Sequence, residues 1–259
     1  KGKGKGKGKG KGKGKGKKGK GTTVTGVEVA VDDDGGNGLL SRMVAEIPAD
    51  GKYALAVSTF PDFDFDGNGV GAGRYVLDVL AINGRVIALS DDDTEEVPLG
   101  FTFPFQGQNW NSVWVNSNGN LTFGSGNTDF TESVAEFLGG PPRIAPLWDD
   151  LNPARGGLVV FNEDAGSATI SFIDVPEFAA TTRNSFSVTL NADGSVECFY
   201  GGMSAIDGMT GVTAGGGAAD PGESDLSGSP IQPVLGTAYE RFTGIGDPFD
   251  LDGVTLQFE

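Results

Sequence analysis

Residues 95–124 read EEVPLGFTFPFQGQNWNSVWVNSNGNLTFG, and residues 143–153 read RIAPLWDDLNP. The first segment alternates apolar and polar residues, which predicts β-strands that each bury one face. Its Gly-Gln and Asn-Gly pairs are typical of tight turns, and turns this close together predict antiparallel hairpins. The two segments therefore favour an all-β fold built from many short strands.

The same alternation of strands and turns covers the rest of the chain. Glycine, at 44 of 259 residues, is abundant, as a chain with many turns requires. The best helical candidate is short, Asp129 to Leu138, with Thr128 or Thr131 as its cap. We expect one or two antiparallel β-sandwiches of jelly-roll type, with long Gly/Asp-rich loops and an extended N-terminal tail. Further strands are expected in GLVVF at 157–161, ATISFIDV at 168–175, SFSVTLNADGSVECFYG at 185–201, with a hairpin at N-A-D-G, and VTLQF at 254–258.

Residues 95–217 resemble the nidogen-like extracellular domain in its bacterial secreted form. The features that carry the resemblance are the Phe-rich strand, the VNSNGNLTFG hairpin and the APLWDDL segment, which occur in that order. The resemblance implies an extracellular surface or matrix module and not an enzyme. It assigns residues 91–259 to a nidogen-like β-sandwich.

Residues 37–80 resemble the second half of the bacterial pre-peptidase C-terminal domain, a small secreted β-sandwich. IPADGKYALAV, the acidic Gly-rich loop after it and the strand GRYVLDV carry this resemblance. Most of the first half of that domain is missing, so residues 22–90 would form a partial sandwich with an exposed edge. The boundary is expected between residues 82 and 94, and the sequence leaves open whether the two parts form one sandwich or two.

The N-terminal segment 1–21, KGKGKGKGKGKGKGKGKKGKG, holds 11 of the 19 basic residues and no acid. The other 238 residues then carry eight basic residues against 35 acidic ones, a net charge near −27. Such a body repels nucleic acid and anionic membranes and favours calcium or cationic partners. No apolar run approaches the roughly 20 residues that span a bilayer. The sequence starts without Met or a signal peptide, which fits a processed or partial chain.

The two-residue repeat of this tail places every lysine on one face of an extended strand. We interpret the tail as a strand that adds to an acidic neighbouring subunit, which would give a homo-oligomer that grows head to tail. An expression tag and a placeholder sequence are the open alternatives. The lysines assigned to assembly are Lys1, Lys3, Lys5, Lys7, Lys9, Lys11, Lys13, Lys15, Lys17, Lys18 and Lys20.

Calcium is the cofactor that the acidic turns suggest. DFDFDGNG has oxygen-bearing residues at alternate positions, as in the first half of a calcium loop, but Gly73 stands where an EF-hand needs Glu. An amphipathic strand, with Phe63 and Phe65 on its other face, explains the same pattern. The candidate calcium ligands are Asp62, Asp64, Asp66, Asn68, Asp91, Asp92 and Asp93.

An enzyme is not expected. The chain has no histidine, which removes Ser-His and Cys-His pairs and the usual neutral-pH base. Asp149 and Asp150 are adjacent, so on a strand they point to opposite faces and are expected to cap a turn beside a buried Trp148. Cys198 is interpreted as a small buried hydrophobe.

Two functions remain open at this point. The first is a structural subunit of an extracellular filament or surface matrix, assembled through the tail. The second is a secreted adhesin or binding module for polysaccharide or a surface protein. Trp110 and Trp114, four residues apart, are expected on one strand face, which is core more often than a sugar platform. Asn120 begins an N-x-T glycosylation motif.

Overall fold

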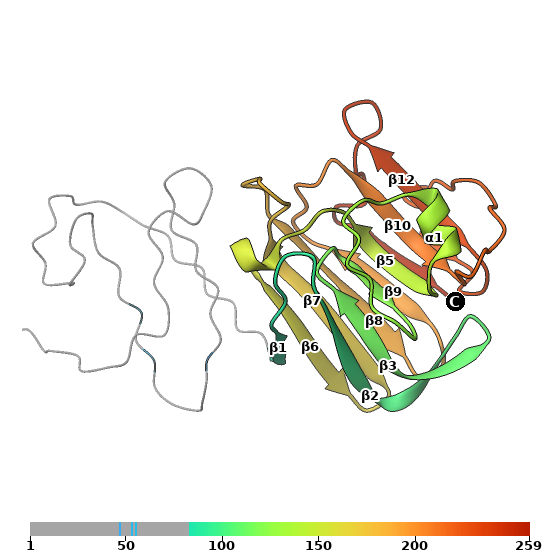
Figure 1. The fold of residues 1–259 in the computed structure, drawn as a ribbon, viewed down its shortest axis with the longest axis horizontal. Helices are drawn as coiled ribbons and strands as arrows, with labels where there is room; N and C mark the ends of the chain where they lie inside the picture. The colour runs from blue at the N-terminus through green and yellow to red at the C-terminus, as the bar shows by residue number, and fades with distance from the viewer. Residues whose placement is uncertain (1–46, 48–52, 54, 56–82) are drawn as a thin grey trace, which may run out of the picture.

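The computed structural model describes residues 47, 53, 55 and 83–259. The Lys-Gly tail, the candidate ligands Asp62 to Asn68 and, apart from those three single residues, the partial pre-peptidase resemblance lie outside the described residues. Residues 83–259 form two stacked β-sheets with a helix against one of them (Figure 1). The expected all-β sandwich is confirmed.

The seven-stranded sheet has the order β1-β6-β7-β8-β9-β13-β11. Neighbouring strands are antiparallel except for the parallel pair β11 and β13. Buried and partly exposed residues alternate along β7 and β8, as expected of strands with one face on a core. The strands are β1 (Arg85–Ile87), β6 (Leu158–Asp164), β7 (Ser167–Val175), β8 (Asn184–Asn191), β9 (Val196–Tyr200), β11 (Ile231–Gln232) and β13 (Thr255–Phe258).

The six-stranded sheet has the order β12-β10-β5-β4-β3-β2 and is antiparallel. Its central strands β4 and β5 are buried along their whole length, because both faces of this sheet are covered there. The strands are β2 (Thr94–Phe105), β3 (Gln108–Asn116), β4 (Asn120–Thr122), β5 (Arg143–Trp148), β10 (Asp207–Thr213) and β12 (Ala238–Thr243).

The main core lies between the two sheets. Stacked and tilted rings of Phe103, Phe105 and Phe123 fill one part of it, and Phe172 stacks on Phe186 in another. Cys198 is fully buried in this core, and burial raises the pKa of its thiol well above the ordinary range. The interpretation of Cys198 as a small buried hydrophobe is confirmed.

A β-bulge in β5 gives the APLW segment two buried faces. The register with β10 shifts at Pro146, so Ile144 and Leu147 face the main core while Ala145 and Trp148 face the other side. Proline suits the bulge because it has no N–H to pair. Its carbonyl instead accepts hydrogen bonds from the hydroxyls of Tyr200 (2.8 Å) and Thr210 (2.7 Å).

Helix α1 (Val134–Gly139) covers the outer face of the six-stranded sheet, beside β5 and β10 (Figure 1). A second core of Phe137, Ala145, Trp148, Met209 and Tyr239 lies beneath it. A short 3₁₀ turn (Pro153–Arg155) follows β5.

The predicted helix start was wrong. Ser133 is the cap: its hydroxyl accepts from the Glu136 N–H (3.2 Å) and donates to the Glu136 carboxylate (2.6 Å). Upstream, Asn127 and Asp129 accept hydrogen bonds from the backbone two residues on. These Asx-turns compete with helix, so α1 begins after them.

The expected domain division between residues 82 and 94 stays a prediction. Within that interval, β1 pairs with β6, and Ile87 and Leu89 are buried in the main core. The hairpin at N-A-D-G is confirmed: it joins β8 to β9, and Gly194 adopts φ +96° there.

Candidate functional site

Three carboxylates meet at one end of the sandwich. Asp91 and Asp92 lie in the loop between β1 and β2, and Asp150 follows β5. One oxygen from each lies within 4.8 Å of the other two. Burial and the charge of Asp92 raise the pKa of Asp91, and burial with the charges of Asp92 and Asp91 raises that of Asp150. The structure thus brings Asp91 and Asp92, two of the ligands predicted from sequence, close to Asp150, which the sequence assigned only to a turn.

Asp93, the third acid of the run, shapes the loop. Its carboxylate accepts hydrogen bonds from the backbone and hydroxyl of Ser90 (3.0 Å each) and from the backbone of Thr94 (2.8 Å). The backbone hydrogen bond from Ser90 is the main cause that lowers the pKa of Asp93. Asp93 therefore holds its neighbours Asp91 and Asp92 in place.

Asn118 lies under the carboxylate cluster in the turn between β3 and β4. The side chain is fully buried, and its Nδ2 donates to Asp92 Oδ1 at 3.0 Å. Its own Oδ1 has no hydrogen-bond partner. Gly119 follows with φ +72°, and a Cβ there would collide with the backbone oxygen of Leu147. The Asn-Gly pair signalled a turn from sequence, but nothing in it indicated which acids the asparagine would meet.

Asp149 lies just after the end of β5 and is surrounded by further acids. Burial, followed by the charge of Glu177, raises the pKa of Asp149 to about 8, and Asp207 and Glu132 add smaller effects. Asp149 Oδ1 accepts from the backbone of Asp150 at 2.7 Å, and Trp148 is fully buried.

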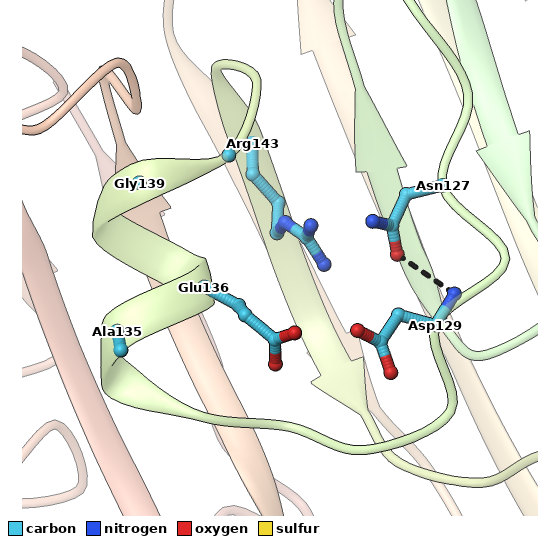
Figure 2. A pocket seen from close by; sticks show the side chains of 7 residues that line it. Asn127, Asp129, Ala135, Glu136, Gly139 and Arg143 are labelled. Atoms are coloured by element: carbon cyan, nitrogen blue, oxygen red, sulfur yellow. Dashed lines mark hydrogen bonds between the residues drawn. The ribbon is translucent and has the colours of Figure 1, made fainter.

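A separate open pocket of about 310 Å³ lies between α1, the loop before it and the start of β5. Figure 2 shows the Arg143 guanidinium pointing into it, above the facing carboxylates of Asp129 and Glu136. Asn127 lies on the far side, where its side-chain oxygen accepts from the Asp129 backbone at 3.1 Å. Ala135, Gly139 and Gly140 complete the lining.

Arg143 is fully buried and only partly satisfied. Its Cζ lies 3.7 Å from the centre of the Trp148 ring, and its Nη1 donates to Asn120 Oδ1 at 3.2 Å. Nε and Nη2 have no partner, and no ion pair within 4.0 Å joins Arg143 to Asp129 or Glu136. Burial lowers the pKa of Arg143 to about 10, although both carboxylates act in the opposite direction.

This pocket was missed from sequence because Arg143 opens an otherwise apolar strand. A lone arginine before a buried run was the available signal, but its stacking partner Trp148 reaches the same face only through the bulge. The pocket offers acceptors from the carboxylates of Asp129 and Glu136, whereas the Arg143 guanidinium is buried in its wall. Such a set suits a small polar ligand that carries hydroxyl donors.

Two expectations about this region were wrong. Trp110 packs on Phe123 in the main core, whereas Trp114 lies on the outer face, where a Cβ on Gly126 would approach its ring to 2.8 Å. The shifted register between β2 and β3 separates the two tryptophans. Asn120 is fully buried and accepts from Asn116 (2.9 Å) and Arg143, so its glycosylation motif is not accessible in the fold.

A family model described as NIDO related matches residues 77–243. No curated protein and no solved structure matches. Among the described residues, no helix has the length and apolar character needed to cross a membrane.

Proposed function

Because the chain belongs to the NIDO-related family, a non-enzymatic and extracellular kind of domain, we propose that it is a structural subunit of a secreted filament or surface matrix. The subunits would join when the Lys-Gly tail of one copy adds as a strand to the next. One observation carries this proposal: the opposite charges of the tail and the body.

The charge separation is nearly complete. Residues 83–259 contain 25 acidic residues, five arginines and no lysine, a net charge of −20, whereas residues 1–21 contain 11 lysines and no acid. Opposite charges on two parts of one chain favour contacts between copies, since they steer association and fix its orientation. The sum of the two parts also keeps a free subunit acidic.

The edge strand β2 is the acceptor that we propose. It ends the six-stranded sheet, so its outer backbone groups face no strand among the described residues. Asp91 to Asp93 precede it. Glu95 and Glu96 lie near its start, within the part of the strand that pairs with β3. A Lys-Gly strand on this edge would gain backbone hydrogen bonds and acidic neighbours together.

Electron microscopy at low salt tests this proposal on three proteins. These are the full chain, a variant without residues 1–21, and a variant of full length in which the tail lysines are replaced by glutamine. We expect fibres only from the full chain, and their loss as salt screens exposed charge pairs. Fibres that persist without the tail would overturn the proposal.

Monodisperse particles from all three proteins would instead favour the second function, a binding module for polysaccharide. The Arg143 pocket is the observation that favours it, because the carboxylates of Asp129 and Glu136 that line it can accept hydrogen bonds from hydroxyl groups. Under that function, Asp129→Asn would weaken retention on a polysaccharide column, while Asp164→Asn, an exposed change on the β6–β7 hairpin, would not.

A further inference from the structure

The outer face of the seven-stranded sheet has no second layer among the described residues. All strands of residues 83–259 belong to the two sheets, and α1 packs on the six-stranded one. No described strand or α-helix therefore covers the side of β7 and β8 that points away from the main core. On the neighbouring strand β9, Phe199 is 49% exposed and Glu197 is exposed on the same face.

The central part of this face is built from short, uncharged side chains. Buried residues alternate with half-exposed ones along β7 and β8, and Asp174, the only acid in these two strands, is buried. Residues 83–259 as a whole carry 25 acids and five arginines. Two copies can therefore approach through this face with little repulsion between like charges. The outward hydroxyl residues are Ser167, Thr169, Ser171, Ser185, Ser187 and Thr189.

The register of the strands makes the face complementary to itself. Ser171 pairs with Ser187, and the same row continues to Val160 on β6 and to Phe199 on β9. A two-fold axis parallel to the strands, between β7 and β8, would place Ser171 of one copy on Ser187 of the other. The same axis would place the Phe199 ring over Val160, so the centre of the contact is small and polar and both ends are apolar.

The next row repeats this complementarity with polar groups. It contains Asn162, Thr169, Thr189 and Glu197, and the hydroxyls of the two threonines lie 2.9 Å apart. The two-fold axis would bring the Asn162 amide of one copy opposite the Glu197 carboxylate of the other. Glu197 accepts from Gln257 at 3.3 Å within its own chain, and the partner's amide would supply a second donor.

The face is large enough for a specific contact. Strands β6, β7, β8, β9 and β13, about 4.8 Å apart and roughly six to seven residues long at about 3.4 Å per residue, span roughly 550 Å². Two such faces would bury about 1,100 Å², and a specific interface needs about 1,000 Å² in total.

We propose that the outer face of the seven-stranded sheet binds a second copy of this chain, sheet on sheet, about a two-fold axis. Sheets that stack in this way keep their strand directions within about 30° of each other. The contact uses neither the Lys-Gly tail nor β2. It would join subunits side by side, whether or not they also add to one another end to end.

Sedimentation velocity of the full chain in about 0.5 M sodium chloride tests the contact. Such salt screens the repulsion between two acidic bodies and also the attraction of the tail for a neighbour. We expect a two-copy species whose share rises with protein concentration and with salt. Association through the tail should instead be lost as salt rises, so the face contact and the filament can fail separately.

Ser187→Glu would place one carboxylate from each copy close to the axis. We expect its dissociation constant to be at least tenfold higher than that of the unmodified chain, with an unchanged near-ultraviolet circular dichroism spectrum. The matched control is Thr181→Glu, which adds the same charge at an exposed position in the loop between β7 and β8 and should associate as the unmodified chain does.

Phe199→Thr tests the contact without an added charge. Threonine suits a strand, so the sheet should persist, but the half-exposed ring at the end of the first row is removed. We expect the dissociation constant to rise several-fold in the same sedimentation measurement.

The proposal is overturned if the full chain stays monomeric over the whole range of salt, or if Ser187→Glu associates as strongly as Thr181→Glu. A monomeric chain that loses its retention on a polysaccharide column through Phe199→Thr would also overturn it, and would assign this face to a glycan.

Discussion

The Glu240 side chain on β12 accepts a buried backbone hydrogen bond and lies near other acidic residues. Its Oε2 accepts a hydrogen bond from the backbone of Leu226, a fully buried residue, at 2.8 Å. Burial, together with the smaller effects of the charges of Asp250, Asp225 and Asp247, raises the pKa of Glu240 to about 7, although the hydrogen bond from Leu226 acts in the opposite direction. The folded protein therefore binds this proton more tightly than the unfolded chain, whose glutamate has a pKa near 4.5.

The sign of the effect on stability follows from linkage. Proton binding to Glu240 stabilises the folded state fully below pH 4.5, and this contribution is lost as the pH rises through about 7. Glu240→Gln removes the ionisation and keeps an oxygen for the Leu226 N–H. We expect the urea midpoint of the unmodified protein to fall more between pH 4.5 and pH 8 than that of the variant.

Asp164→Asn is the control for this measurement, since it removes a carboxylate from an exposed hairpin position. Its urea midpoint should follow the unmodified protein across the same pH range. Parallel curves for Glu240→Gln and the unmodified protein would show that Glu240 does not hold a proton in the fold.

At the scale of elements, the Ser133 cap of α1 decides where this helix begins. Ser133→Ala would leave the Glu136 N–H without its acceptor, and we expect a loss of about 1 kcal/mol in the free energy of unfolding. Ser133→Thr keeps the hydroxyl and should lose less than half of that. Urea unfolding measures both variants, and equal losses would mean that side-chain volume, not the cap, is what matters.

The sequence indicated well where strands and turns lie. It indicated less well which face of the sheet each side chain occupies. Hairpins such as N-A-D-G rest on local backbone chemistry, which neighbouring residues determine. The faces of Trp110 and Trp114 depend on a register shift between β2 and β3, which involves residues far apart in the chain. Likewise, the S-x-x-E pattern at Ser133 was readable from sequence, but two earlier threonines competed for the role of cap.

The candidate sites were only partly predictable for the same reason. The acidic run Asp91 to Asp93 was visible, yet the three side chains diverge because Asp93 turns back to Ser90 and Thr94. Asp150 and Asn118 enter the cluster from distant segments, and Arg143 meets Trp148 through the β5 bulge. Contacts between distant segments require the fold.

At the scale of the whole molecule, the last strand completes the sandwich. β13 lies between β9 and β11, and both Leu256 and Phe258 are fully buried. A variant that ends at Val254 loses these two side chains, a cost of roughly 3–6 kcal/mol at about 1.5–3 kcal/mol each. That is a large share of the roughly 5–15 kcal/mol by which native domains are stable.

We therefore expect the variant ending at Val254 to be unfolded or aggregated, as judged by near-ultraviolet circular dichroism and limited proteolysis. Thr255→Ser, a small change at an exposed position of the same strand, should leave both signals unchanged. A protease-resistant core in the shortened variant would show that residues 83–254 fold without β13, and that the matched segment 77–243 is closer to a complete unit.

The hydrogen bond from Tyr200 to the Pro146 carbonyl crosses the sandwich, since β9 belongs to one sheet and β5 to the other. Sliding one layer past its partner would break this contact in a place that water does not reach, and would leave a hydroxyl unpaired. This hydrogen bond therefore opposes shear between the two sheets. A domain whose two sheets are joined by a buried hydrogen bond resists a force that pulls the sheets in opposite directions.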